Sequence, residues 1–150
     1  MSTTHKEQLI ITGPTKIKTT QVAIAGSKNA ALPIIAASIL ATKPVVLTRI
    51  PPLADTCAML ETLSYLGGKI RLDEKMNIHI TPENIKKHII PLTLAKKMRT
   101  SFLFLGPLLA TAKQAIIPLP GGCKIGARPV DIHLDGLRKL FDVGVDIIQN

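Results

Sequence analysis

Leu40-Ala41-Thr42 and Leu109-Ala110-Thr111 are two copies of one tripeptide. The same interval separates Pro51 from Pro120. In both copies the tripeptide ends an apolar segment with helical spacing, and residues that favour a strand follow it. Repetition at a fixed interval indicates a repeated structural unit. The order helix, strand, helix, strand occurs twice and predicts an α/β fold.

Beyond Pro120 the two copies lose their constant interval. If Gly144 corresponds to Gly67, the second copy carries eight extra residues. A competing register leaves five extra residues in the loop, with residues 141–143 as a separate insertion. That register pairs three leucines of each copy: Leu60, Leu63 and Leu66 with Leu134, Leu137 and Leu140. Both registers place extra residues around Gly121-Gly122-Cys123, and a segment present in one copy only is a candidate for function.

Local patterns place the other elements. Apolar alternation predicts strands over residues 9–11, 21–25, 45–48, 115–117 and 145–148, and a hairpin over residues 69–80. Helical spacing predicts helices over residues 28–41, 56–66 and 94–110, and one that begins near residue 132. Gly67 is the expected stop of the second helix, and Pro33 predicts a kink or a late start in the first. The second copy reaches only its first strand, so we expect a piece of a longer protein.

The composition is that of a folded, basic protein. Of 150 residues, 46% are hydrophobic and 3% aromatic, so disorder is not expected and the core depends on aliphatic side chains. The net charge of +9 suits anionic ligands, but the basic residues are scattered and few rings can stack on bases, so no nucleic acid is expected. The longest uncharged runs are too short for a membrane. The polar start and the two cysteines fit a reducing cytoplasm.

Gly26-Ser27-Lys28-Asn29 lies between a predicted strand and a predicted helix. Ser27 can cap the helix, Lys28 adds a positive charge, and Asn29 offers a donor and an acceptor. This combination suits a phosphate or a carboxylate, and a capped helix with a solvated lysine is the competing interpretation. Residues 96–101 carry cations at the predicted front of another helix, where they oppose the helix dipole. An anionic ligand would relieve that conflict, as would lysines extended into water.

The third candidate is the extra segment of the second copy, Gly121-Gly122-Cys123-Lys124-Ile125-Gly126-Ala127-Arg128-Pro129-Val130-Asp131. Its glycines predict a mobile loop that can approach a ligand. Lys124 and Arg128 flank Cys123 and favour its thiolate, and Arg128 can bind a phosphate in a bidentate manner. Cys123 is therefore the predicted reactive cysteine. Cys57, inside a predicted helix, is predicted to be buried and inert.

Together these segments resemble the UDP-N-acetylglucosamine enolpyruvyl transferase family, also called UDP-N-acetylglucosamine 1-carboxyvinyltransferases. Residues 26–33 are similar to the family's phosphoenolpyruvate-binding start. Residues 98–101 with 105–108 resemble its second signature, and residues 120–123 with 126–131 resemble its catalytic loop.

The resemblance implies a fold of repeated βαβαββ units, the inside-out α/β barrel type, in two domains with the active site between them. About two units would be present. Residues 1–21 would be the opening strand belonging to the other domain, and residues 22–150 an incomplete substrate-binding domain with two of its three units.

The resemblance also implies the reaction and its residues. Enolpyruvyl would pass from phosphoenolpyruvate to the 3′-hydroxyl of UDP-N-acetylglucosamine, the first committed step of peptidoglycan synthesis, without a cofactor or a metal. Lys28 and Asn29 would contact phosphoenolpyruvate. Cys123 would be the catalytic proton donor and the residue that fosfomycin alkylates. The contacts with UDP-N-acetylglucosamine would come from Arg99, Arg128, Pro129, Val130, Asp131 and Ile132.

Alternatives to a complete enzyme stay open. We expect the isolated chain to show little or no turnover. The main alternative is a non-catalytic fragment that binds a UDP-sugar or other anions weakly, or that needs a complementary chain to supply the missing domain. The related shikimate-phosphate branch lacks the cysteine loop, so Cys123 argues against it.

Overall fold

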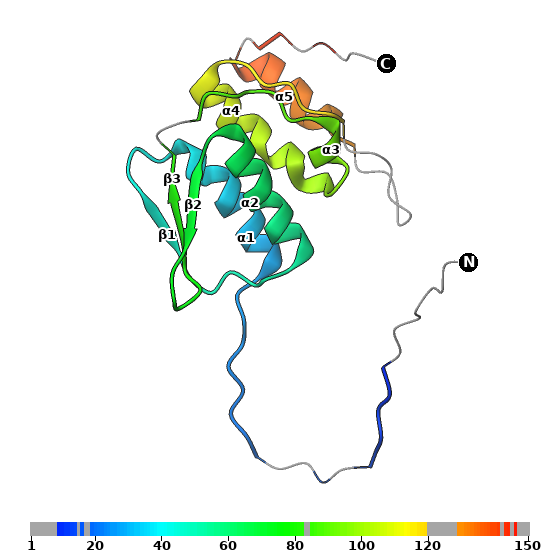
Figure 1. Cartoon of the computed structure of the whole chain (residues 1–150). Coiled ribbons are helices and arrows are strands. Elements are labelled where there is room, and N and C mark those ends of the chain that lie inside the picture. Colours follow the sequence, from blue (N-terminus) through cyan, green and yellow to red (C-terminus); the bar gives the residue numbers. More distant parts are fainter. Residues whose placement is uncertain are drawn as a thin grey trace, which may run out of the picture.

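The computed structural model describes residues 9–14, 16, 19–82, 85–119, 129–141, 143–144 and 146. In this part of the chain a three-stranded antiparallel sheet lies beside a group of helices (Figure 1). In chain order the elements are α1 (Lys28–Ala37), η1 (Ser38–Leu40), β1 (Val45–Leu47), α2 (Ala54–Leu66), β2 (Lys69–Leu72), β3 (Ile78–Thr81), α3 (Leu92–Ala95), η2 (Arg99–Phe104), α4 (Leu105–Ala112) and α5 (Asp131–Phe141), where η marks a 3₁₀ helix.

The first predicted helix is confirmed as α1, followed by the 3₁₀ helix η1. Of the two alternatives expected from Pro33, a kink or a late start, the late start is wrong, because α1 begins at Lys28 with Pro33 inside it. Ser27 caps the helix by accepting a hydrogen bond from the Ala30 N–H at 3.4 Å. A proline inside a helix costs about 3 kcal/mol. The opposite contribution comes from four buried side chains: Ala31, Leu32, Ile35 and Ala36. Because burying one large aliphatic side chain stabilises a fold by about 1.5–3 kcal/mol, this packing outweighs the proline.

The remainder of the first unit agrees with the sequence patterns. α2 ends at Gly67, whose φ of 117° is a left-handed conformation that favours glycine. The predicted hairpin forms, with β2 antiparallel to β3. The strand order is β1-β3-β2, so β3 is central, and it buries Ile78 and Ile80. The first unit therefore has the order α, β, α, β, β.

The core lies between α1, α2, the sheet and the helices of the second unit. Its largest fully buried side chains include Ile35, Met59, Leu63, Leu66, Ile80, Phe104 and Leu108. Cys57 does not belong to this core, because its side chain is exposed. The prediction of a buried Cys57 is therefore wrong. The face of α2 that carries Met59, Leu63 and Leu66 points inward, and Cys57 lies on the solvent side.

The part of the chain predicted to be the second copy is less regular than expected. The expected helix over residues 94–110 is wrong as a single element, since it is divided into α3, η2 and α4. Met98 is extended between the first two, with φ −154° and ψ 144°. Pro107 lies in the first turn of α4, where the missing N–H has no helical partner to lose, so a new helix begins there. The predicted helix near residue 132 is confirmed as α5.

The predicted strand over residues 115–117 is reduced to one bridge, in which Ile116 pairs in parallel with Ile89. Two hydrogen bonds of 2.9 Å hold the bridge. Pro118 lies two residues beyond Ile116, where the next N–H of the ladder would donate, and proline has no N–H. The predicted strand over residues 145–148 lies almost wholly outside the described residues.

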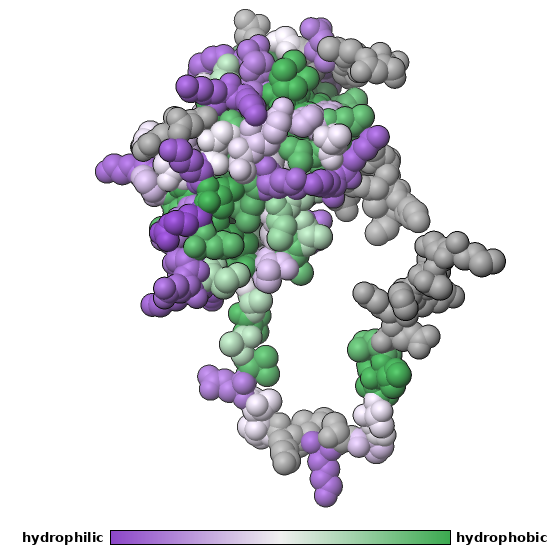
Figure 2. Space-filling model, viewed as in Figure 1, coloured by the Kyte–Doolittle hydropathy of each residue, from purple (hydrophilic) through white to green (hydrophobic). Residues whose placement is uncertain are grey.

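The predicted strands over residues 9–11 and 21–25 are wrong, because the described residues there belong to no strand. Figure 1 shows these stretches leading away from the folded body, and Figure 2 shows their apolar side chains in contact with solvent. The apolar side chains concerned are between 74% and 86% exposed: Leu9, Ile10, Ile11, Val22 and Ile24. A strand needs a second strand for its N–H and C=O groups, and the described part of the chain supplies none here.

Candidate anion-binding cleft

A cleft of about 620 Å³ lies where the starts of α1 and α2 meet the segment that follows α3. Its lining consists of Lys28, Asn29, Leu32, Asp55, Lys96, Lys97, Met98 and Thr100. Two segments that the sequence indicated separately, the start of the first helix and residues 96–101, therefore share one cavity. Buried Leu32 and Met98 give the cleft an apolar part, and lysines supply its charge.

The start of α1 is held in place by a close backbone contact. Gly26 lies against the carbonyl oxygen of Arg49, and any Cβ at Gly26 would collide with that oxygen. Glycine is therefore required here for steric reasons. The contact fixes the segment that leads into Lys28 and so positions one wall of the cleft.

Lys28 forms an ion pair across the cleft. Its Nζ lies 2.7 Å from Asp55 Oδ2, with the two side chains 43% and 39% exposed. Asp55 is in the first turn of α2, where a carboxylate stabilises the helix dipole, whereas Lys28 opposes the dipole at the first position of α1. The pair therefore offsets an unfavourable charge at one helix start with a favourable charge at the other.

Lys96 and Lys97 correct one sequence interpretation. They do not lie at the front of a long helix, because α3 ends just before them and Lys96 is its C-cap. Cations at the C-terminal end of a helix are favourable, so the predicted conflict with the dipole does not exist for these two lysines. Lys97 Nζ also donates to both oxygens of Glu61 in α2, at 2.6 and 2.8 Å. Lys96 is exposed and forms no ion pair within the described residues.

Thr100 contributes a polar atom without a partner. Its hydroxyl Oγ1 is buried and makes no hydrogen bond to any described residue. A buried hydroxyl without a partner destabilises a fold by roughly 1–3 kcal/mol. Because Thr100 also lines the cleft, this unsatisfied hydroxyl belongs to a residue of the candidate site.

The other predicted site residues lie elsewhere or cannot be placed. Arg99 is the first residue of η2, next to the cleft in sequence. Asp131 and Ile132 begin α5, and both are exposed. The lining of the cleft, as far as the structure describes it, does not include them, nor Pro129 or Val130. Cys123 and Arg128 lie outside the described residues.

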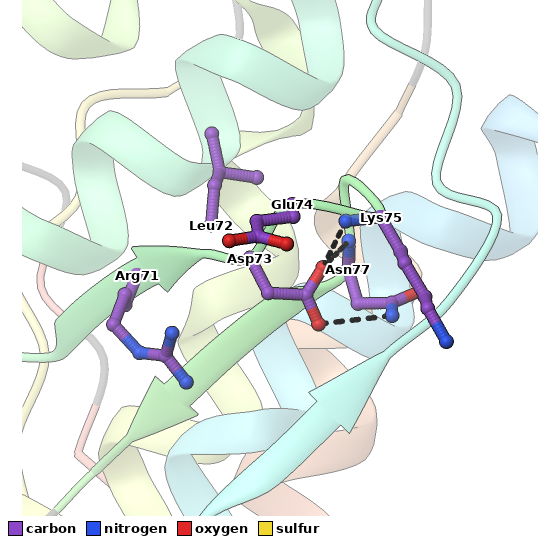
Figure 3. A pocket seen from close by; sticks show the side chains of 6 residues that line it. All are labelled: Arg71, Leu72, Asp73, Glu74, Lys75 and Asn77. Carbon is purple, nitrogen blue, oxygen red and sulfur yellow. Dashed lines mark hydrogen bonds between the residues drawn. The ribbon is translucent and has the colours of Figure 1, made fainter.

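A second cavity, of about 470 Å³, lies at the turn between β2 and β3 (Figure 3). Asp73 accepts hydrogen bonds there from the N–H groups of Lys75 and Asn77 at 2.9 and 2.8 Å, and from Asn77 Nδ2 at 3.0 Å. His79 Nε2 lies 3.0 Å from the same carboxylate. The bonds from His79 and then Asn77 hold the pKa of Asp73 well below its usual range. Because the carboxylate of Asp73 already bonds to groups of the hairpin itself, we assign it a role in stabilising the turn and not in binding a ligand.

Sequence reasoning missed Asp55 and Glu61, and it indicated Thr100 only as a member of residues 96–101. Both acidic residues lie on α2, in which the sequence indicated no site residue. Each pairs with a lysine that is distant in the sequence. An acidic residue in the first turn of a predicted helix was the available signal for Asp55, but it did not indicate the partner.

Comparisons with known proteins identify the family. Residues 11–150 match the model of EPSP synthase (3-phosphoshikimate 1-carboxyvinyltransferase). A UDP-N-acetylglucosamine 1-carboxyvinyltransferase of Coxiella burnetii (strain Dugway 5J108-111) is 45% identical over 94% of this chain and 32% of that protein. The enzyme of the same name from Hydrogenovibrio crunogenus is 43% identical over 89% of this chain and 32% of its own length.

One solved structure shares the fold. It is the enolpyruvyl transferase NikO from Streptomyces tendae, with a TM-score of 0.53 and 20% identity over 57% of this chain and 20% of that one. None of the helices in the described part of the chain is long and apolar enough to cross a membrane. The chain spans about a third of the length of the curated relatives it matches, 32% in each case quoted. The match over residues 11–150 and the relatives together confirm the predicted resemblance, and the chain belongs to the EPSP synthase family of 1-carboxyvinyltransferases.

Proposed function

We propose that the chain supplies part of a UDP-N-acetylglucosamine 1-carboxyvinyltransferase. This enzyme would transfer enolpyruvyl from phosphoenolpyruvate to the 3′-hydroxyl of UDP-N-acetylglucosamine, in the cytoplasm, as the first committed step of peptidoglycan synthesis. The 45% and 43% identity to relatives of that name supports the choice within the family.

The observation that carries the proposal is the convergence of Lys28, Asn29 and residues 96–100 on one cleft. Lys28 supplies a mobile positive charge with three donors, and Asn29 supplies a neutral donor, for the phosphate of phosphoenolpyruvate. The unpartnered hydroxyl of Thr100 is a further donor. With three lysines against the carboxylates of Asp55 and Glu61, the described cleft retains a positive charge that attracts an anion.

The remaining roles come from residues identified by resemblance. Cys123 protonates C3 of phosphoenolpyruvate, which leaves C2 electron-poor. The oxygen of the sugar 3′-hydroxyl adds to C2 and gives its proton to a base. C3 then loses a proton, the double bond forms again, and phosphate leaves. Arg99, Arg128 and residues 129–132 hold the UDP-sugar.

The proposal divides the chain at residue 21. Residues 1–21 belong to the other domain, where a second strand would let them form the opening strand that their described part does not form in this chain alone. Residues 22–150 form two of the three units of the substrate-binding domain. The exposed apolar side chains of residues 9–11 support the first part, because the described residues give them nothing to pack against. The order of α1, β1, α2, β2 and β3 supports the second.

A non-catalytic role is the second candidate. This chain forms the cleft by itself, although it spans only 32% of the length of its relatives. It could therefore bind an anion without the rest of the enzyme. Such a fragment would bind phosphoenolpyruvate, a UDP-sugar or another anion without turnover, or would await a complementary chain.

Titration of the ¹⁵N-labelled chain with phosphoenolpyruvate, followed by NMR, tests the cleft. We expect amide shifts at Asn29 and Thr100. Lys28→Gln weakens binding at least about tenfold, because a hydrogen bond to a charged group contributes roughly 1.5–3 kcal/mol. Lys43→Gln is the matched control, since Lys43 is exposed and does not line the cleft. Unchanged spectra at Asn29 and Thr100 would remove the cleft from the proposal, and an assay of phosphate release separates catalysis from binding alone.

A further inference from the structure

Asp55 is an acidic residue in the lining of a cleft whose other charged residues are lysines. Its Oδ2 bonds to Lys28, whereas Oδ1 has no hydrogen-bond partner among the described residues. An ionised carboxylate accepts hydrogen bonds but cannot donate them. An anion that enters the cleft is therefore repelled by this group, unless the anion brings a proton of its own to donate.

The carboxylate of Asp55 cannot move far from the cleft, because the start of α2 is fixed. The neighbouring Thr56 is 1% exposed, and its Oγ1 accepts a hydrogen bond from the Leu53 N–H at 3.0 Å and donates to the Pro51 carbonyl at 2.6 Å. Lys28, in contrast, has a long and flexible side chain. When a ligand arrives, Lys28 can turn toward it, and the carboxylate of Asp55 stays.

The strength of the existing ion pair permits that exchange. Both partners are more than a third exposed. An exposed ion pair of this kind changes an equilibrium constant by a factor of roughly five at most. A ligand that forms several charge-assisted hydrogen bonds gains more than this. The pair therefore holds Lys28 in the empty cleft without blocking it.

We propose that Asp55 makes the cleft selective for oxyanions that carry a proton, such as hydrogen phosphate or a singly protonated phosphate monoester. The O–H of the ligand donates to Asp55 Oδ1, and its other oxygens accept from Lys28 and Asn29. This inference rests on the proposed function, whose substrate is a phosphate monoester and whose product is inorganic phosphate. Sulfate has the shape and the charge of hydrogen phosphate but no proton at neutral pH, so it cannot form the bond.

The test compares inorganic phosphate with sulfate at neutral pH and equal ionic strength. Binding to the full chain is followed through the amide signals of Asn29 and Thr100. The wild-type chain should bind phosphate at least about tenfold more tightly than sulfate, since a hydrogen bond to a charged group contributes about that much. In Asp55→Asn the ratio falls toward one, because sulfate then meets an amide donor. Asp55→Glu keeps the acceptor and keeps the preference for phosphate.

Asp135→Asn is the charge-matched control. It removes an exposed carboxylate that lies 2.9 Å from Arg138 on α5, outside the lining of the cleft, and should leave the ratio unchanged. Equal binding of both anions by the wild-type chain overturns the inference even if Asp55→Asn fails to fold, and so does an Asp55→Asn variant with the wild-type ratio. In both cases binding of phosphoenolpyruvate would leave the proposed function standing. A wild-type chain that binds none of the three ligands overturns both proposals.

Discussion

Leu63 is fully buried in α2, and Gly68 packs directly against it. A Cβ on Gly68 would come within 3.0 Å of Leu63 Cγ. Leu63→Ala leaves a cavity in this close-packed region and should destabilise the fold by about 2–5 kcal/mol, measured by urea unfolding. Leu72→Ala, at a position 54% exposed on β2, should cost less than about 1 kcal/mol. Equal losses in the two variants would show that Leu63 is not part of the core.

Asp73 gives the stability of the hairpin turn a dependence on pH. Hydrogen bonds from His79 and Asn77 lower the pKa of Asp73 in the folded chain, so the unfolded chain binds the proton first as the pH falls. The stabilisation is therefore complete above the unfolded pKa of about 4. It is lost progressively below that pH, toward the lower folded value.

The corresponding experiment is urea unfolding at a series of acidic pH values. The wild-type chain should lose stability more steeply below about pH 4 than Asp73→Asn, which cannot titrate at this position. Glu74→Gln is the control, because Glu74 is exposed, adjacent, and free of side-chain hydrogen bonds to described residues. Parallel acid profiles for the wild-type chain and Asp73→Asn would refute the assignment.

At the scale of the element, two glycines should respond in opposite directions to the same substitution. Gly67 ends α2 with a φ of 117°, so Gly67→Ala should destabilise by about 1–2 kcal/mol. Gly136 lies inside α5, and a Cβ there would meet nothing within 4 Å beyond its chain neighbours and the helix's own backbone. Gly136→Ala should therefore stabilise by about 0.5–1 kcal/mol through helix propensity. Thermal unfolding distinguishes the two, and destabilisation by Gly136→Ala would contradict the position of α5.

The elements that the sequence located correctly are those defined by local signals. α2 has its apolar spacing and its glycine stop, and the hairpin of β2 and β3 joins neighbouring segments. The wrong predictions concern elements whose formation depends on residues distant in the sequence. Residues 9–11 have strand-like alternation but no second strand among the described residues. Pro118 limits a ladder that alternation alone would have continued.

The same division applies to the cleft. Lys28, Asn29 and residues 96–101 attracted attention because cations near predicted helix ends are visible in the sequence. Asp55 and Glu61 did not, because their lysine partners are 27 and 36 residues away. The dipole argument failed for Lys96 and Lys97 because the predicted helix is divided at Met98, yet both lysines line the cleft.

At the scale of the whole molecule, the residues that line the cleft come from three segments of this chain: α1, the start of α2 and the segment after α3. We expect these segments to bind an anion without closing over it. Proton transfer to carbon and addition of a hydroxyl both require a closed site with groups on both sides of the substrate. This chain, which spans 32% of the length of its Coxiella burnetii relative, should therefore bind a substrate without converting it.

Complementation tests that separation. The chain alone, given phosphoenolpyruvate and UDP-N-acetylglucosamine, should bind without releasing phosphate. Release should begin when a second chain is added that carries the part of the Coxiella burnetii relative outside the matched region. In the mixture Cys123→Ala should lower the rate by about a hundredfold or more, the usual effect of losing a general acid. Cys57→Ala controls for loss of a thiol, because Cys57 is exposed and does not belong to the lining of the described cleft. Phosphate release by the isolated chain at the rate of the mixture would mean that this chain closes the site without a second domain.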